Sequence, residues 1–172
     1  MRVAFSGTHR TGKTTLVGAI AALVPHYAVI DEPYRILEDE GYEACDPPSL
    51  EDYEAQLRTS LEQIAAAPAD ALFDRCPLDV LAYLEALDGD LEPWIDDVRD
   101  AVARLDLIVV VSIESPDRIA VGAHEDRRLR GAVDEHLQRL ALEDAYGFEP
   151  TTLEVHGELA ARVDQVRRTM RI

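Results

Sequence analysis

The chain has 172 residues, the size of one domain with a substantial core, so a single domain is expected over residues 1–172. Its formal net charge of −17 argues against a surface that binds nucleic acid or an anionic membrane, because both depend on basic patches. No segment approaches 18 consecutive apolar residues, and the chain starts directly with its first strand, so neither a membrane span nor a signal peptide is expected. Cys45 and Cys76 are the only thiols, and a soluble cytoplasmic protein is expected.

The first predicted elements are a strand, a glycine-rich loop and a helix. RVAFS (residues 2–6) is a short apolar run bounded by a glycine, and TTLVGAIAALV (residues 14–24) is typical of a helix. Between them GTHRTGKT fits the pattern glycine, any four residues, glycine, lysine, threonine. Backbone N–H groups in such a loop surround a phosphate at a helix N-terminus. The residues predicted to bind the nucleotide are Gly7, Thr8, His9, Arg10, Thr11, Gly12, Lys13, Thr14 and Thr15.

Lysine usage supports this interpretation. Of 17 basic residues, Lys13 is the only lysine. A compact ammonium suits a phosphate cradle that a planar guanidinium does not fit. Lys13 is therefore expected to reach the β- and γ-phosphates of the nucleotide, and the Thr14 hydroxyl to ligate Mg²⁺.

Further strands and helices alternate along the rest of the chain. We expect strands over residues 27–33, 70–76, 106–113 and 151–157, and helices over residues 49–67, 77–87, 92–105, 133–147 and at the C-terminus. Ser49 and Asp52 form a capping-box pattern. Alternation of this kind predicts an α/β fold, a three-layer sandwich with a parallel sheet of five strands.

Charged residues follow two of the predicted strands, where ligands of such folds bind. Asp31 and Glu32 come after the second strand. Either acid can hold a water molecule bound to Mg²⁺ or accept a proton from a hydroxyl group, and Glu32 is the preferred base. Asp74 and Arg75 end the third strand, where a charged pair needs partners. Asp74 is expected either to help hold Mg²⁺ or to act as the base, and Arg75 is expected to orient the substrate.

A polar segment rich in arginine follows the fourth strand. It contains Arg118, Arg127, Arg128 and Arg130 within an acidic chain. We expect a lid over about residues 115–131 whose arginines close over the transferring phosphoryl group. The alternative is a helix face paired with the acids at positions 125 and 126.

GTHRTGKT, the DEP after the second strand, the DRCPLDVLAYL after the third and the arginine-rich segment together resemble the P-loop small-molecule kinases, especially the thymidylate, deoxynucleoside and nicotinamide riboside kinases. The resemblance implies strand order 2-3-1-4-5, ATP and Mg²⁺ as cofactors, and a homodimer in some members. It also implies a role for Glu32 near the acceptor hydroxyl, for Asp74 and Arg75 beside the acceptor, and for the lid arginines. Together with the loop motif and the strand ends, the catalytic residues are expected to be Lys13, Glu32, Asp74, Arg75 and the lid arginines, and the residues near the metal Thr14, Asp31 and Asp74. The acceptor is expected to be a nucleoside, a nucleotide or another small hydroxyl or phosphate compound.

Two other classes of protein were compared with this pattern. A GTPase needs an Asn-Lys-x-Asp guanine reader, and the chain contains no asparagine and no second lysine. A P-loop ATPase or a nucleotide-binding regulator without an acceptor remains the alternative, with Glu32 activating water. The sequence thus favours a phosphotransferase that moves the γ-phosphoryl group of ATP to a small molecule, without a nucleic-acid or membrane partner.

Overall fold

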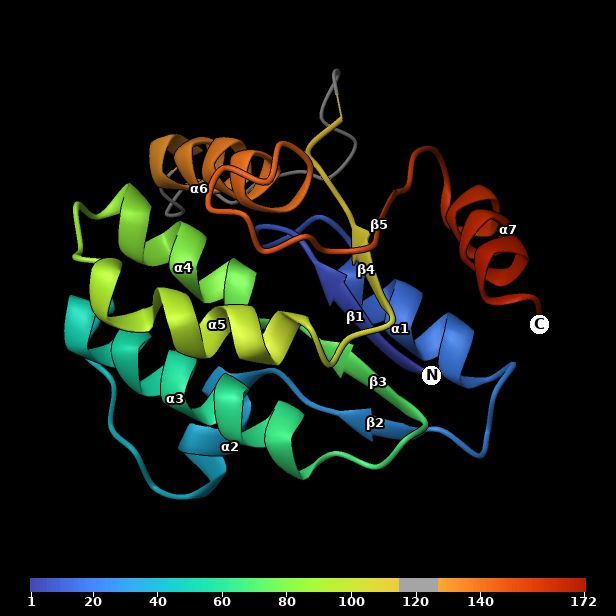
Figure 1. Cartoon of the computed structure of the whole chain (residues 1–172), viewed down its shortest axis with the longest axis horizontal. Coiled ribbons are helices and arrows are strands. Elements are labelled where there is room, and N and C mark those ends of the chain that lie inside the picture. The colour runs from blue at the N-terminus through green and yellow to red at the C-terminus, as the bar shows by residue number, and fades with distance from the viewer. Residues whose placement is uncertain (115–126) are drawn as a thin grey trace.

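Five parallel strands form the central sheet of the protein. The computed structural model describes residues 1–114 and 127–172. The strands are β1 (Arg2–Ser6), β2 (Ala28–Ile30), β3 (Ala71–Asp74), β4 (Leu107–Val110) and β5 (Thr152–Glu154). They pair in the order β2-β3-β1-β4-β5 (Figure 1), which confirms the expected parallel sheet and its strand order.

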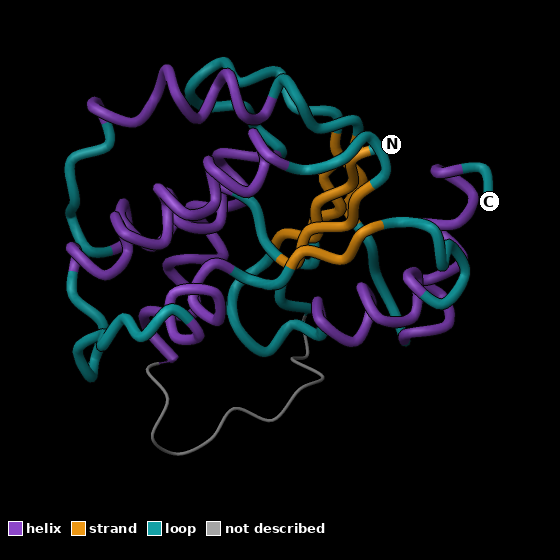
Figure 2. The backbone as a smooth tube through the Cα atoms, turned by 90° about the horizontal axis from the view of Figure 1, so that it is seen from below, coloured by secondary structure: helices purple, strands orange, loops and turns teal. Residues whose placement is uncertain are grey.

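Helices cover both faces of this sheet (Figure 2). In the described ranges they are α1 (Lys13–Ala21), α2 (Pro33–Asp39), α3 (Leu50–Ala66), α4 (Pro77–Ala86), the short 3-10 helix η1 (Glu92–Trp94), α5 (Ile95–Val102), α6 (Arg127–Ala141) and α7 (Leu159–Met170). The expected three layers are therefore present.

None of the described helices has the length and apolar character needed to cross a membrane.

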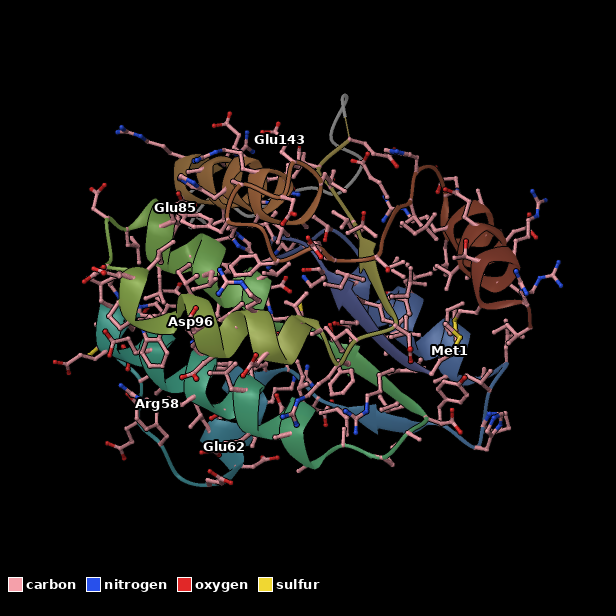
Figure 3. The ribbon with its side chains drawn as sticks, viewed as in Figure 1. Met1, Arg58, Glu62, Glu85, Asp96 and Glu143 are labelled. Atoms are coloured by element: carbon pink, nitrogen blue, oxygen red, sulfur yellow. The ribbon has the colours of Figure 1, made fainter. Side chains whose placement is uncertain are left out.

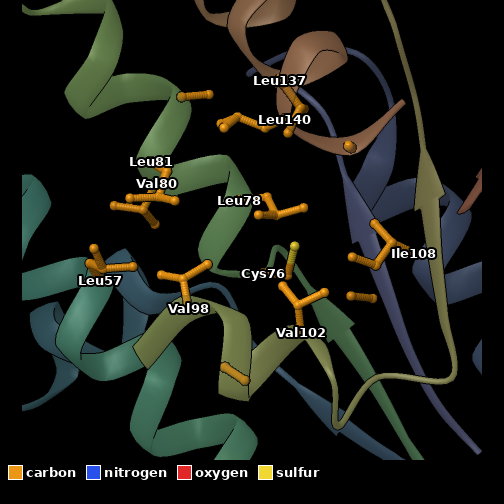
Figure 4. Packing of buried hydrophobic residues seen from close by; sticks show 14 of the residues in the cluster. Leu57, Cys76, Leu78, Val80, Leu81, Val98, Val102, Ile108, Leu137 and Leu140 are labelled. Atoms are coloured by element: carbon orange, nitrogen blue, oxygen red, sulfur yellow. The ribbon is translucent and has the colours of Figure 1, made fainter. Parts of the chain in front are cut away.

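Two separate clusters of buried side chains hold the layers together. On one face, α3, α4, α5 and α6 pack on the sheet through residues such as Leu57, Leu81, Val98, Ile108 and Leu137 (Figure 4). On the other face, α1 and α7 pack on the sheet through a smaller cluster. The strands β1 and β4 lie at the centre, and their continuous apolar runs are what burial on both faces requires.

Acidic side chains are spread over the outer surface of the helices. Figure 3 shows Glu62 on α3, Asp96 on α5 and Glu143 just after α6, all of them exposed. This distribution keeps much of the net negative charge on the solvated side of the helical layers.

The α3 helix begins with the expected capping box. The Ser49 side chain accepts from the Asp52 backbone N–H, and Asp52 Oδ2 accepts from the Ser49 backbone N–H at 2.7 Å. Asp52 also accepts from the Tyr42 hydroxyl at 2.9 Å and from the Cys45 N–H at 3.2 Å. One buried carboxylate thus fixes both the helix start and the loop that leads to it.

We expect Asp52→Asn to lower the midpoint of thermal unfolding by about 3–6 °C at pH 7, because the amide cannot accept all of these bonds. The bonds, that from the Ser49 backbone first, lower the pKa of Asp52 from 3.8 to about 2. A lowered carboxyl pKa gives stability that is present above 3.8 and is lost as the pH falls through about 2. The difference between variant and wild type should therefore shrink in melts at pH 2–3, and a difference independent of pH would contradict the role of the charge.

The largest departure from the predicted elements lies at α6. The helix predicted over residues 133–147 spans Arg127–Ala141. The lid predicted over about residues 115–131 is not confirmed, because residues 127–131 form the first turns of α6 and residues 115–126, with Arg118, lie outside the described residues. Arginine has a high helix propensity, and Leu129 and Arg130 are packed against the rest of the protein, so this run of arginines forms a helix instead of a flap.

Strand register brings the predicted charged residues to one edge of the sheet. Phe5 of β1 pairs with Asp74 of β3, and Ile30 of β2 pairs with Phe73. The chain after β2 therefore leaves the sheet beside the end of β3, and the loop after β1 leaves it on the other side of β3. The carboxyl ends of β1, β2 and β3 position the candidate site.

Candidate functional site

The loop between β1 and α1 has the shape that binds phosphate. Gly7 lies so close to the neighbouring strand that a Cβ atom there would collide with the carbonyl oxygen of Val111. Gly12 has φ +90° and caps α1, and Arg10 also has a left-handed backbone at φ +53°. Alternating left-handed residues turn successive N–H groups toward one concave side, which forms an anion-binding nest at the start of a helix.

The first part of this loop is anchored by Asp79 of α4. Its carboxylate is buried and accepts from the Ser6 hydroxyl at 2.6 Å, from the Gly7 N–H at 2.8 Å and from the Cys76 N–H at 2.9 Å. The last of these bonds belongs to the capping arrangement of α4. One acid therefore fixes the start of the loop relative to both β1 and α4.

Lys13 begins α1, and its ammonium group is buried behind the loop. Its Nζ atom donates to the Thr8 carbonyl at 2.9 Å. Burial, followed by the charge of Arg75, lowers the pKa of Lys13 from 10.5 to about 7, against the carboxylates of Asp79, Asp74 and Glu32. The charged form of a lysine buried in this way is strongly stabilised when an anion enters the site.

Thr14 of α1 and Asp74 of β3 each carry a side-chain oxygen atom that can bind a metal ion. Burial raises the pKa of Asp74 above its usual value, and the nearby Thr14 hydroxyl and Lys13 ammonium offset this increase only in part. Asp74 Oδ1 is buried and has no hydrogen-bond partner in the described parts of the chain. A hydroxyl and a carboxylate with an unsatisfied oxygen fit Mg²⁺, which takes its other ligands from phosphate oxygens and water.

No cluster of three or more His, Cys, Asp or Glu side chains suited to a metal ion occurs among the described residues. A magnesium ion held by Thr14 and Asp74 would take its remaining ligands from phosphate oxygens and water. That is the usual arrangement where substrate phosphates share the ion.

Glu32 and Arg75 form an ion pair across the ends of β2 and β3. Arg75 Nε donates to Glu32 Oε2 at 2.9 Å, and Arg75 Nη1 lies 3.6 Å from Asp79 Oδ1. Burial raises the pKa of Glu32, but the charge and hydrogen bond of Arg75 outweigh it and hold that pKa below its usual value. Glu32 is therefore an ionised carboxylate able to accept a proton.

Arg75 itself is held in an unusual backbone conformation. Its φ is +92°, and its guanidinium lies 5.6 Å from the centre of the Tyr83 ring. Although burial lowers its pKa, Tyr83, Asp79 and Glu32 raise that pKa further above its usual value. Nη1 is buried and makes no hydrogen bond to any described residue. Backbone strain of this kind, a left-handed conformation at a residue other than glycine, is typical of binding sites, as is an unsatisfied hydrogen-bond donor.

The other predicted site residues lie in different places. The Asp31 side chain is exposed and its carbonyl accepts from Gln63 at 2.8 Å, while the carboxylate that acts on both Lys13 and Asp74 is that of Glu32. Arg127 and Arg128 are exposed at the start of α6. Arg130 is buried and contacts backbone carbonyls of the glycine-rich loop.

Three residues at the site were not predicted. Asp79 had a local signal, since it stands three residues after Cys76 and before an apolar helical run, as the acid of a capping box does. Tyr83 reads as an ordinary apolar helix position, yet its hydroxyl lies 3.0 Å from His9 Nδ1. Arg162 of α7 donates to the Thr11 carbonyl at 2.7 Å across 151 residues, and no local pattern indicates that contact.

Comparisons with known proteins agree with this geometry. The chain matches the family described as an AAA domain over residues 2–162. No curated protein matches it. Among solved structures it is similar to deoxyadenosine kinase from M. mycoides with bound dATP, with 15% identity, all of both chains covered and a TM-score of 0.72.

Two further solved structures have the same fold. The NadR protein in complex with NAD and AMP-PNP is 21% identical with a TM-score of 0.70; the match covers 99% of this chain and 49% of that one. Thymidylate kinase from Ehrlichia chaffeensis is 13% identical, with 98% of each chain covered and a TM-score of 0.66. The chain therefore belongs to the AAA domain family and has the fold of the P-loop kinases.

Proposed function

We propose that the protein transfers the γ-phosphoryl group of ATP, with Mg²⁺, to a small-molecule acceptor that is a nucleoside or a nucleotide. The observation that carries this proposal is the convergence of Glu32, Asp74 and Arg75 beside Lys13, beyond what a phosphate loop alone requires. Phosphate binding alone needs no buried arginine paired with a second acid. A phosphotransferase uses such a pair, the acid to accept the hydroxyl proton and the arginine to orient the acceptor.

The donor half of the reaction rests on the loop and on α1. Backbone N–H groups and Lys13 hold the β- and γ-phosphates, and Thr14 and Asp74 hold Mg²⁺. The metal supplies charge neutralisation on the phosphates. Lys13, which burial makes reluctant to carry a charge in the free protein, becomes a full cation when the phosphates arrive.

The acceptor half rests on the ends of β2 and β3. Glu32 is held ionised by Arg75, so it accepts the proton of an acceptor hydroxyl, and the buried Nη1 of Arg75 has a donor left to orient the acceptor. Solved structures of this fold are those of kinases with dATP or with dCMP and dCDP bound, and of NadR with NR, which supports a nucleoside or nucleotide acceptor here.

We also propose that the protein works as a soluble cytoplasmic enzyme, alone or as a homodimer, with no nucleic-acid or membrane partner. The charge of −17 opposes binding to polyanions. Cys45 is exposed and Cys76 is buried, and both are free thiols, as is typical of a reducing compartment.

The test is ATP turnover with Mg²⁺, alone and with a panel of nucleosides, nucleoside monophosphates, nicotinamide riboside and unrelated alcohols. ADP and the phosphorylated product are followed by mass. We expect ADP to form together with one phosphorylated acceptor, and the reaction without acceptor is the control. ADP and free phosphate formed equally without any acceptor would contradict the proposal and favour a P-loop ATPase.

A further inference from the structure

The phosphate loop is held from outside by two arginines of the C-terminal helices. Arg130 of α6 donates from Nε to the His9 carbonyl at 3.1 Å and from Nη2 to the Arg10 carbonyl at 3.2 Å. Arg162 of α7 donates from Nη1 to the Thr11 carbonyl at 2.7 Å. Three consecutive loop carbonyls therefore each accept from a guanidinium group.

Peptide geometry gives these contacts a consequence on the other side of the loop. In a planar trans peptide the C=O and N–H bonds point in opposite directions. Fixing the carbonyls of His9, Arg10 and Thr11 toward the arginines therefore turns the N–H groups of Arg10, Thr11 and Gly12 away from them. These are N–H groups of the loop that is proposed to surround phosphate.

The same contacts hold the loop in a costly conformation. Arg130 binds the carbonyls of the two peptide groups that flank Arg10, the residue with φ +53°. A left-handed non-glycine residue persists only where its surroundings over-determine it. Arg130 supplies that constraint, and Arg162 does the same for the peptide that enters Gly12, whose φ is +90°.

Both guanidinium groups are built into the structure rather than lying on its surface. Arg130 is 4% exposed and Arg162 is 8% exposed. Arg162 also donates from Nε to the Gly157 carbonyl at 2.8 Å and from Nη2 to Glu114 at 3.1 Å, and the same Glu114 oxygen accepts from the Gly157 N–H. The ends of β4 and β5, the start of α7 and the phosphate loop thus meet at one side chain.

We propose that Arg130 and Arg162 are positioning residues that set the phosphate-binding shape of the loop. They act through the loop carbonyls and not by touching the transferring phosphoryl group. The proposal rests on the nucleotide binding of the proposed function but does not depend on transfer to an acceptor. It also gives Arg130 a role different from the lid role expected from the sequence.

The test uses Arg130→Met and Arg162→Met, with Arg139→Met and Arg167→Met as matched controls. Arg139 and Arg167 lie on the same two helices and form half-exposed ion pairs with Glu85 and Asp164. Calorimetry measures the dissociation constants of Mg·ATP and of Mg·tripolyphosphate, which touches only a phosphate site. Both should weaken by about tenfold in each test variant, the loss of one charge-assisted hydrogen bond or more, and stay within twofold in the controls.

Lysine variants separate loop geometry from charge and from general stability. Arg162→Lys keeps one donor for the Thr11 carbonyl, so it should recover most of the affinity. Arg130→Lys cannot reach two carbonyls with a fork, so it should recover less. Thermal melts without ligand identify a temperature at which each variant is folded, and if a methionine variant does not fold, its lysine variant supplies the comparison.

Two results would overturn the proposal. One is Mg·tripolyphosphate binding within twofold of wild type in the folded variants at positions 130 and 162. The other is a full recovery of the affinity by lysine at both positions, which would show that the positive charge and not the geometry of the guanidinium group matters. A wild-type protein that binds Mg·ATP but phosphorylates no acceptor would contradict the proposed function and leave this binding test intact.

Discussion

Lys13→Met is expected to reduce phosphoryl transfer by about a thousandfold or more while leaving the fold intact. Lys13 is the only lysine, and its Nζ atom is already held at the loop by its hydrogen bond to the Thr8 carbonyl. The negative charge on the transferring group grows less screened as water is excluded, so a missing ammonium is not replaced by solvent. The measurement is turnover of ATP with the acceptor found in the panel.

Stability should move in the opposite direction from activity. The pKa of Lys13 is lowered by burial, so its charged form is disfavoured in the folded protein. A lowered lysine pKa costs stability fully below about pH 7, and this cost disappears as the pH rises above 10.5. Methionine fills similar space without a charge, so the variant should unfold at the same or a higher temperature at pH 7.

Lys13→Arg is the matched control for charge. It keeps a cation but replaces a compact ammonium with a planar fork, and we expect it to be almost as inactive as the methionine variant. Turnover near the wild-type rate in Lys13→Met would contradict the assignment of the loop as the donor site. Turnover near the wild-type rate in Lys13→Arg would instead show that charge alone is sufficient.

Local patterns were enough to predict the sheet and the phosphate loop. RVAFS, the glycine spacing of GTHRTGKT and the apolar run of residues 106–113 each specify their element within a few residues, while the strand order, with β1 at the centre, is the one that the resemblance implies. Positions at the ends of buried strands also found the Glu32, Asp74 and Arg75 group. Parallel strands place their carboxyl ends together, so this convergence follows from topology.

Contacts between distant segments were beyond such patterns. Arg162 reaches the Thr11 carbonyl from a helix whose sequence is that of any amphipathic surface helix. The arginines of residues 127–130 have the composition of a flap, because composition shows charge but not whether a side chain is buried. Only tertiary structure shows that Arg130 points inward while Arg127 and Arg128 lie on the surface.

Glu32→Gln is expected to lower kcat by about a hundredfold or more with little change in the KM for ATP, because glutamine cannot accept the hydroxyl proton. The ion pair with Arg75 holds the pKa of Glu32 below its usual value. The base should therefore stay ionised above pH 4.5, and the activity that depends on it should be lost only as the pH falls through that lowered pKa. Initial rates across pH in both proteins measure this.

Asp74→Asn separates the base from the metal ligand. Its buried carboxylate oxygen without a hydrogen-bond partner suits Mg²⁺, so this variant should need more Mg²⁺ for half-maximal rate and should recover activity in excess Mg²⁺. Glu32→Gln should not recover, and Glu38→Gln on the exposed surface of α2 is the control for loss of one acid.

If excess Mg²⁺ rescues Glu32→Gln but not Asp74→Asn, the two roles are exchanged. If both variants keep full activity and Asp31→Asn does not, the base is Asp31, and the ion pair of Glu32 with Arg75 serves only to hold the ends of β2 and β3 together.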